Sequence, residues 1–191
     1  MQLDVLQEET TTSKWSIPLS RTMAVPAEKI WETITTPEVL EKSHPFVKKN
    51  PTERWSGVGS TDMIYYYSGM TLTRRITRWI DGVGYDLEAT DEEGRTSHVT
   101  WRIHDVDGAS STLTIAILPY LFEGAPGPLR WLPHHLYLRP MITRYLDSVL
   151  KGFEAYITTG EAVRRNQFGS HYVFSPRIKG ENYPDRRAEI S

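Results

Sequence analysis

Apolar and polar residues alternate along much of the chain, and this pattern predicts β-strands. Apolar side chains occupy every second position in a series of short runs, and glycine-containing turns separate most of these runs. Such runs are typical of strands with one buried face. We expect strands at about 14–25, 46–50, 62–68, 70–80, 85–89, 99–103 and 113–117. Because short turns join the later strands, they should form an antiparallel meander.

A second pattern, apolar residues at helical spacing, predicts three helices. Pro26 opens the first, because proline at the first helical position loses no hydrogen bond, and Ile30 and Ile34 follow at helical spacing. Residues 37–42 should form a second, short helix. From 140 to 157 the helical period is strong, and a helix of that length spans about 27 Å, enough to cross a small domain.

The order of these elements predicts an α+β fold in a single domain. A length of 191 residues fits one domain, which we place at residues 14–160. Residues 1–13 form a polar N-terminal segment, and residues 161–191 a basic, aromatic tail that packs on the domain or on a partner. Residues 118–138 are apolar and interrupted by prolines, which favours a lid over a cavity or a contact between two copies.

Composition excludes several kinds of site and partner. The chain has no cysteine, which rules out disulfides, thiolate metal sites and cysteine nucleophiles. A formal charge of −2 gives no global attraction to nucleic acid, so none is expected as a partner. No apolar run approaches the ~20 residues of a membrane span, and the acidic, polar start is unlike a signal peptide. We therefore expect a cytoplasmic protein with no integral membrane association.

Aromatic residues are abundant, at 11% of the chain: Trp 6, Tyr 10 and Phe 5. Many of them lie at alternating positions of the predicted strands and on the first and last helices. They therefore belong to the inside of one domain. There they either fill the space between sheet and helix or line a ligand cavity.

The start of the domain resembles a known superfamily. Residues 25–32 read Val-Pro-Ala-Glu-Lys-Ile-Trp-Glu, and Thr-Pro-Glu follows at 36–38. This string and the order of elements over residues 14–157 resemble the START-like superfamily, also labelled SRPBCC, or polyketide cyclase/dehydrase and lipid-transport proteins. The resemblance implies a helix-grip fold, in which a curved antiparallel sheet of about seven strands grips the long helix over a hydrophobic cavity. Cyclases, dehydratases and lipid carriers share that fold, so it leaves the function open.

Inward positions of the sheet and the last helix supply the candidate ligand-binding residues. Apolar parity along each strand, and helical spacing in the last helix, selects Tyr65, Tyr67, Leu72, Arg74, Ile76, Tyr85, Leu87, Trp101, Ile115, Tyr145 and Val149. Inward tyrosine hydroxyls can orient a ligand or donate to a developing oxyanion. Tyrosine also packs well in strands without any such role.

Three residues are candidates for catalysis. Arg74 lies on the apolar side of its strand, where a guanidinium can hold a ligand carboxylate or enolate. The alternative is that strand twist turns it to water, paired with Glu88 or Asp86. His44 follows the second helix at one rim of the expected cavity, as a general base near neutral pH. Tyr67 is the third candidate.

The remaining histidines give no metal or cofactor site. His98 and His104 lie on the polar side of their strand, and we expect them to be solvated. His134 and His135 are adjacent, so they point in different directions, and no third ligand follows at a regular spacing. No phosphate-binding or dinucleotide motif is present. We expect no metal and no cofactor.

Three functions remain open at this stage. The first is a binding or carrier protein for a small hydrophobic ligand of lipid, polyketide or aromatic type. One alternative is a cyclase- or dehydratase-like enzyme acting on such a ligand. The other is a regulatory domain that binds partner proteins and whose cavity is filled by its own side chains. A homodimer is a further candidate assembly.

Overall fold

The structure is a computed structural model that describes residues 13–120, 131–178 and 180. The polar segment expected at the N-terminus, part of the expected lid and the end of the tail lie outside these residues.

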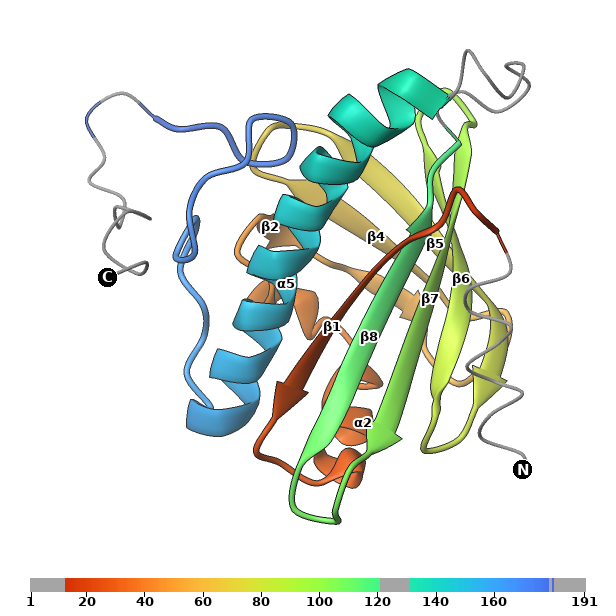
Figure 1. The fold of residues 1–191 in the computed structure, drawn as a ribbon, viewed down its shortest axis with the longest axis vertical. Coiled ribbons are helices and arrows are strands. Elements are labelled where there is room, and N and C mark those ends of the chain that lie inside the picture. The colour runs from red at the N-terminus through yellow and green to blue at the C-terminus, as the bar shows by residue number, and fades with distance from the viewer. Residues whose placement is uncertain (1–12, 121–130, 179, 181–191) are drawn as a thin grey trace.

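Eight strands form one antiparallel sheet (Figure 1). They are β1 (Ile17–Met23), β2 (Val47–Lys49), β3 (Thr52–Arg54), β4 (Thr61–Tyr66), β5 (Thr71–Ile80), β6 (Gly84–Asp91), β7 (Thr96–Asp105) and β8 (Ser111–Leu118). The spatial order is β1-β8-β7-β6-β5-β4-β2, and β3 also pairs with β4. From β4 to β8 each strand pairs with the next, as the short turns predict, and β1 closes against β8.

The helices lie on the concave side of this sheet (Figure 1). They are α2 (Ala27–Ile34), α3 (Leu40–Ser43) and the long α5 (Arg139–Thr159). The curved sheet and the long helix confirm the expected α+β helix-grip fold. Gly160, in a left-handed conformation with φ 75°, ends α5, as is common at helix C-termini.

The chain is already helical from residue 131, earlier than the prolines suggest. A π-helical turn, η1 (His134–Leu138), precedes α5. Pro140 then lies in the first turn of α5, where the missing N–H of proline costs little. The prolines therefore shape the start of the long helix and do not prevent it.

A close contact between α3 and α5 fixes one end of the core. Gly152 of α5 lies against the Ser43 carbonyl, and a Cβ at this position would overlap that oxygen. The missing side chain lets the end of α3 reach the helix. The following residue, His44, is therefore held beside α5 in the interior.

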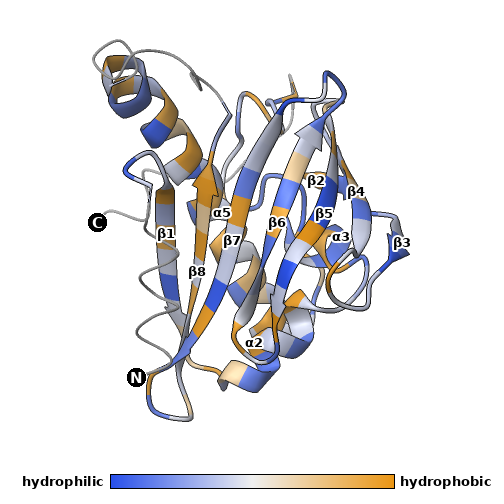
Figure 2. Ribbon diagram, turned by 90° about the vertical axis from the view of Figure 1, so that its right-hand side faces the viewer, coloured by the Kyte–Doolittle hydropathy of each residue, from blue (hydrophilic) through white to orange (hydrophobic). Residues whose placement is uncertain are grey.

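The outer face of the sheet carries the polar residues of the alternating pattern. Figure 2 shows hydrophilic and hydrophobic segments alternating along β5, β6 and β7. His98 and His104 are exposed, as their parity predicts. Arg75 and Glu88 form an ion pair of 2.7 Å between neighbouring strands on this face.

The described part of the tail, residues 161–178, runs back over the domain. The Ser68 amide donates to the Phe174 carbonyl at 3.0 Å, and His171 Nε2 lies 3.2 Å from the Met141 carbonyl. The Arg165 guanidinium lies over the Tyr67 ring, 4.6 Å from its centre. These contacts hold the tail against the site described below.

Within the described residues, every helix is too short or too polar to cross a membrane.

Candidate functional site

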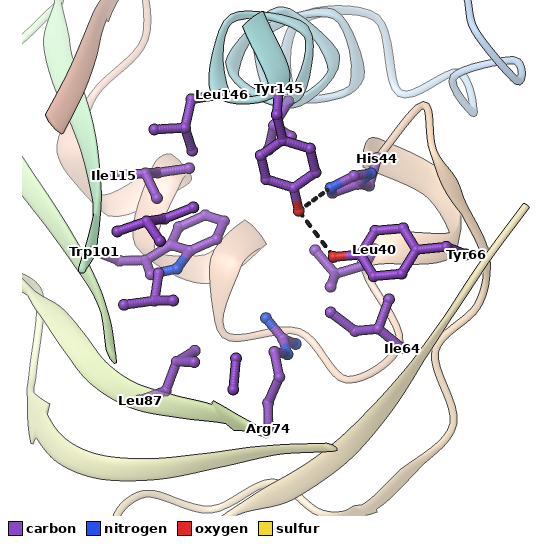
Figure 3. A pocket seen from close by; sticks show the side chains of 14 residues that line it. Leu40, His44, Ile64, Tyr66, Arg74, Leu87, Trp101, Ile115, Tyr145 and Leu146 are labelled. Carbon is purple, nitrogen blue, oxygen red and sulfur yellow. Dashed lines mark hydrogen bonds between the residues drawn. The ribbon is translucent and has the colours of Figure 1, made fainter. Parts of the chain in front are cut away.

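A cavity of about 60 Å³ lies between the sheet and α5 and is partly open (Figure 3). Its apolar wall comes from α3, the sheet and α5, and consists of Leu40, Ile64, Leu87, Ala89, Val99, Trp101, Ile115, Ile117, Leu146 and Val149. Its polar wall consists of His44, Tyr66, Arg74 and Tyr145. The cavity is therefore a small space with two chemically different sides.

Arg74 reaches the cavity from β5 and forms a buried ion pair. Its Nε donates to Asp62 Oδ1 at 2.8 Å, and its Nη2 donates to Asp62 Oδ2. The side chains of Arg74 and Asp62 are only 7% and 1% exposed. Asn50 Nδ2 also donates to Asp62 Oδ2, at 2.9 Å. Burial alone would lower the pKa of Arg74, but the Asp62 carboxylate raises it above its ordinary value, so the guanidinium stays charged.

His44 is buried in the polar wall and does not lie at a rim. Its Nδ1 accepts the Phe46 backbone N–H at 3.1 Å, and its Nε2 lies 3.0 Å from the Tyr145 hydroxyl. Burial and the nearby Arg74 charge lower the pKa of His44 to about 3. The ring is therefore neutral at pH 7, and both nitrogens are in use. This corrects the expectation of a rim base.

Two tyrosine hydroxyls continue this network. Tyr66 of β4 and Tyr145 of α5 have their hydroxyl oxygens 3.0 Å apart, and both rings are buried. Burial raises the pKa of Tyr145 to about 12 and raises the pKa of Tyr66 well above its ordinary value. Both side chains are therefore neutral phenols.

Aromatic residues of the tail pack behind the two tyrosines. The Phe174 ring centre lies 4.9 Å from that of Tyr66 and 4.4 Å from that of Tyr145. The His171 ring lies 6.0 Å from Tyr145 and 5.7 Å from Phe46. The tail therefore supports the side of the tyrosine pair that faces away from the cavity.

A second aromatic group supports Arg74. The Arg74 guanidinium lies 5.6 Å from the centre of the Trp55 ring. Tyr85 is fully buried and stacks between Trp79, at 5.8 Å, and Trp101, at 5.6 Å. Burial raises the pKa of Tyr85 above its ordinary value. Much of the aromatic excess thus fills the core, and only part of it borders the cavity.

The structure brings together seven of the residues selected from the sequence. They are His44, Arg74, Leu87, Trp101, Ile115, Tyr145 and Val149. Of the two alternatives for Arg74, the inward one is observed.

The other five candidates lie elsewhere. Tyr65 is exposed on the outer face, and Tyr67 lies under Arg165 of the tail, so the parity expected for β4 was wrong. Leu72, Ile76 and Tyr85 pack in or against the core but do not border the cavity. On β4 the wrong set of positions was chosen as inward because Asp62 is a charged residue on the buried side of the strand. A charged residue ordinarily indicates the side that faces water.

Sequence reasoning missed Asp62 and Asn50 behind the cavity and seven residues of its wall, which are Leu40, Ile64, Tyr66, Ala89, Val99, Ile117 and Leu146. Leu146 sits on the periodic face of the last helix, so its spacing could have indicated it. Tyr66 stands between two other tyrosines, and in such a run alternation carries no signal.

The adjacent histidines lie apart from the cavity. His134 is buried with Nε2 3.0 Å from the Trp15 carbonyl, and His135 stacks on Trp131 at 4.8 Å. Across residues 13–120 and 131–178, no three His, Asp or Glu side chains gather as a metal site would require.

The family is shown by a match over most of the domain. A family model described as polyketide cyclase / dehydrase and lipid transport matches residues 14–158. The chain belongs to this family. The START-like resemblance of the opening string is thereby confirmed, and the tail beyond residue 158 lies outside the part of the chain that the family model matches.

Solved structures with the same fold are distant in sequence. A START superfamily protein from Mycobacterium smegmatis is 11% identical, with 75% of this chain and 97% of that chain covered and a TM-score of 0.56. The protein XoxI from Bacillus cereus is 11% identical, with coverages of 75% and 96% and a TM-score of 0.59. These likenesses show the fold.

A third structure is longer than this family member. DynU16, a protein of the dynemicin biosynthetic locus, is 14% identical, with a TM-score of 0.56. The match covers 80% of this chain but only 50% of that chain, so the present protein spans about half the length of DynU16. No curated protein matches the chain in sequence.

Proposed function

We propose that the protein binds a small, largely hydrophobic ligand in the cavity between the sheet and α5. The observation that carries this proposal is the two-sided lining, with an apolar wall opposite a wall of buried hydrogen-bonding groups. Ligand sites in proteins are typically apolar pockets with a few fixed polar groups that orient the ligand.

The size of the cavity limits the ligand. Pockets that enclose a drug-sized molecule measure about 300–1,000 Å³, whereas this one measures about 60 Å³. A ligand of that larger class would insert one end and extend through the open side. A smaller ligand would need only a small shift of the walls.

Binding without turnover fits the polar wall better than acid–base catalysis. A general base needs a free lone pair near the proton that it removes. The Nδ1 lone pair of His44 already accepts the Phe46 N–H, and both Asp62 oxygens accept hydrogen bonds from Arg74. The polar wall is therefore built to donate hydrogen bonds.

A substitution that fills the cavity tests the binding proposal. Ala89 is 7% exposed and borders the cavity from β6, so Ala89→Leu places three more carbon atoms in it. Saturable binding of ethylbenzene, followed by ligand-observed NMR, should occur with the unaltered protein and be lost in this variant. Thr90→Leu places the same leucine side chain at the next position, on the other face of the strand, and should bind normally. Equal binding by all three proteins would reject this cavity as the site.

A second candidate function, enzymatic enolisation, is favoured by the inward position of Arg74. Its charge could stabilise an enolate, as in the cyclase- or dehydratase-like alternative. Exchange of the methyl protons of acetophenone in D₂O distinguishes the two functions. We expect the protein to leave the exchange rate at its buffer value, and acceleration that Arg75→Leu retains but Arg74→Lys loses would favour the enzyme.

A further inference from the structure

A backbone amide fixes which ring nitrogen of His44 carries its proton. The Phe46 N–H can only donate, and it points at His44 Nδ1 at 3.1 Å. That nitrogen must therefore carry a lone pair. A neutral imidazole has one N–H, so the proton of His44 lies on Nε2.

The donor of the next hydrogen bond follows from this tautomer: His44 Nε2–H donates to the Tyr145 hydroxyl oxygen, 3.0 Å away. The Tyr145 and Tyr66 oxygens also lie 3.0 Å apart, and only one of their two protons can lie between them. The Tyr145 oxygen has a second lone pair, so either hydroxyl can be the donor of that bond. In both arrangements the other hydroxyl proton meets no acceptor among the described residues and is left for the cavity that both tyrosines border.

The charge on the same wall is already balanced. Arg74 uses Nε and Nη2 on Asp62, and the other described titratable groups of the wall are the neutral His44, Tyr66 and Tyr145. A ligand carboxylate would therefore be a second anion beside Arg74, whose charge Asp62 already balances. It would also lose its hydration by water on entering the cavity. Burying a charge without its own partner is unfavourable.

We infer that the ligand presents a neutral carbonyl oxygen, as in a ketone, ester or amide, to the one free hydroxyl proton of the Tyr66–Tyr145 pair. A carbonyl accepts a hydrogen bond, brings no charge and has no proton of its own that needs an acceptor. The apolar remainder of the ligand then faces Trp101, Ile115 and Leu146 (Figure 3). This inference rests on the proposed binding function and names its ligand class.

Three probes of similar shape test the ligand class: acetophenone, ethylbenzene and benzoate. All three contain a benzene ring. At pH 7 acetophenone carries a neutral carbonyl, ethylbenzene carries no oxygen, and benzoate carries a carboxylate. We expect acetophenone to bind at least tenfold more tightly than benzoate. Tighter binding of benzoate would overturn the inference while leaving the binding function intact, and failure of all three to bind would overturn both.

The double variant Tyr66→Phe with Tyr145→Phe tests the donor, because it keeps both rings that pack on Phe174 and removes only the two hydroxyls. Loss of one such hydrogen bond should weaken acetophenone binding about tenfold and leave ethylbenzene binding unchanged. Tyr65→Phe, which alters the exposed face of β4, should change neither affinity. An equal loss for both probes would show that the two tyrosines serve packing alone.

A spectroscopic readout separates donation from packing. A hydrogen-bond donor polarises a carbonyl group, so the C=O stretch of bound acetophenone should lie at lower frequency with unaltered protein than with the double variant. Each single variant, Tyr66→Phe or Tyr145→Phe, keeps one hydroxyl and should retain part of the shift. An identical stretch frequency in the unaltered protein and the double variant would refute the role assigned to the tyrosine pair.

Discussion

Removing the carboxylate of Asp62 should lower the free energy of unfolding, because it leaves the buried Arg74 guanidinium without its partner. Asp62 accepts two hydrogen bonds from Arg74 and one from Asn50. In Asp62→Ala the guanidinium stays inside, 7% exposed in the present structure, and loses its counter-charge. An uncompensated buried charge is the most costly product of such a substitution.

The expected loss in the free energy of unfolding is about 3–5 kcal/mol. For a domain of this size, 1 kcal/mol corresponds to about 2–4 °C in the unfolding temperature, so the midpoint should fall by roughly 6–20 °C. Removing both partners in Asp62→Leu with Arg74→Met leaves no unpaired charge. The double variant should therefore be far more stable than the sum of the single losses predicts.

Urea unfolding followed by tryptophan fluorescence measures these differences, because Trp55 lies over Arg74 and Trp101 borders the cavity. The exposed pair Arg75–Glu88 on the outer face is the matched control, and Glu88→Ala should cost less than about 1 kcal/mol. A loss below 1 kcal/mol in Asp62→Ala, or strict additivity in the double variant, would refute the reasoning.

Two further predictions concern the polar wall and its support. The pKa of His44 is lowered to about 3 from 6.5, so between these values the unfolded chain binds a proton that the folded chain does not. Stability should be complete above pH 6.5 and fall by up to about 5 kcal/mol as the pH approaches 3, and His44→Gln should flatten a plot of unfolding free energy against pH. Phe174→Ala removes the ring behind the tyrosine pair and should cost about 1–3 kcal/mol, whereas the neighbouring exposed Tyr172→Ala should stay within about 0.5 kcal/mol; equal losses would contradict a supporting role of the tail.

The sequence predicted the fold because each element carries a strong local signal. Pro26 marks the start of α2, glycine-containing turns separate the strands, and a long helical period marks α5. The start of α5 was harder to place, because prolines at 133 and 140 interrupt the pattern. A π-helical turn accommodates them, and such turns have no simple sequence signal.

The site was predicted only in part, and β4 shows why. Its residues 63–66, and Tyr67 after them, are all apolar or aromatic, so alternation does not say which of them face inward. The polar residue before them, Asp62, would ordinarily mark the outer side. Only the long-range pairing with Arg74, which β5 brings opposite Asp62, makes the inward position of this carboxylate favourable.

The depth of His44 and the contribution of the tail also depend on contacts that are remote in sequence. His44 is buried because Gly152, more than a hundred residues later, lets α3 approach α5. Phe174 meets Tyr66 and Tyr145 only after the chain has turned back beyond α5. Neither contact produces a periodic pattern of residues that could be recognised in a single sequence.

The position of the cavity inside the only extended core of the described chain has a practical consequence. Its walls belong to the sheet and to α5 at once, so they exist as a site only when the domain is folded. Any molecule that occupies it must bind the native state alone, and mass action then raises the unfolding temperature as the concentration of that molecule increases. The unfolding temperature of this protein therefore reports whether a ligand is bound in the cavity. Fractions of an extract of its native cell can be screened for those that raise this temperature before the chemistry of the ligand is known.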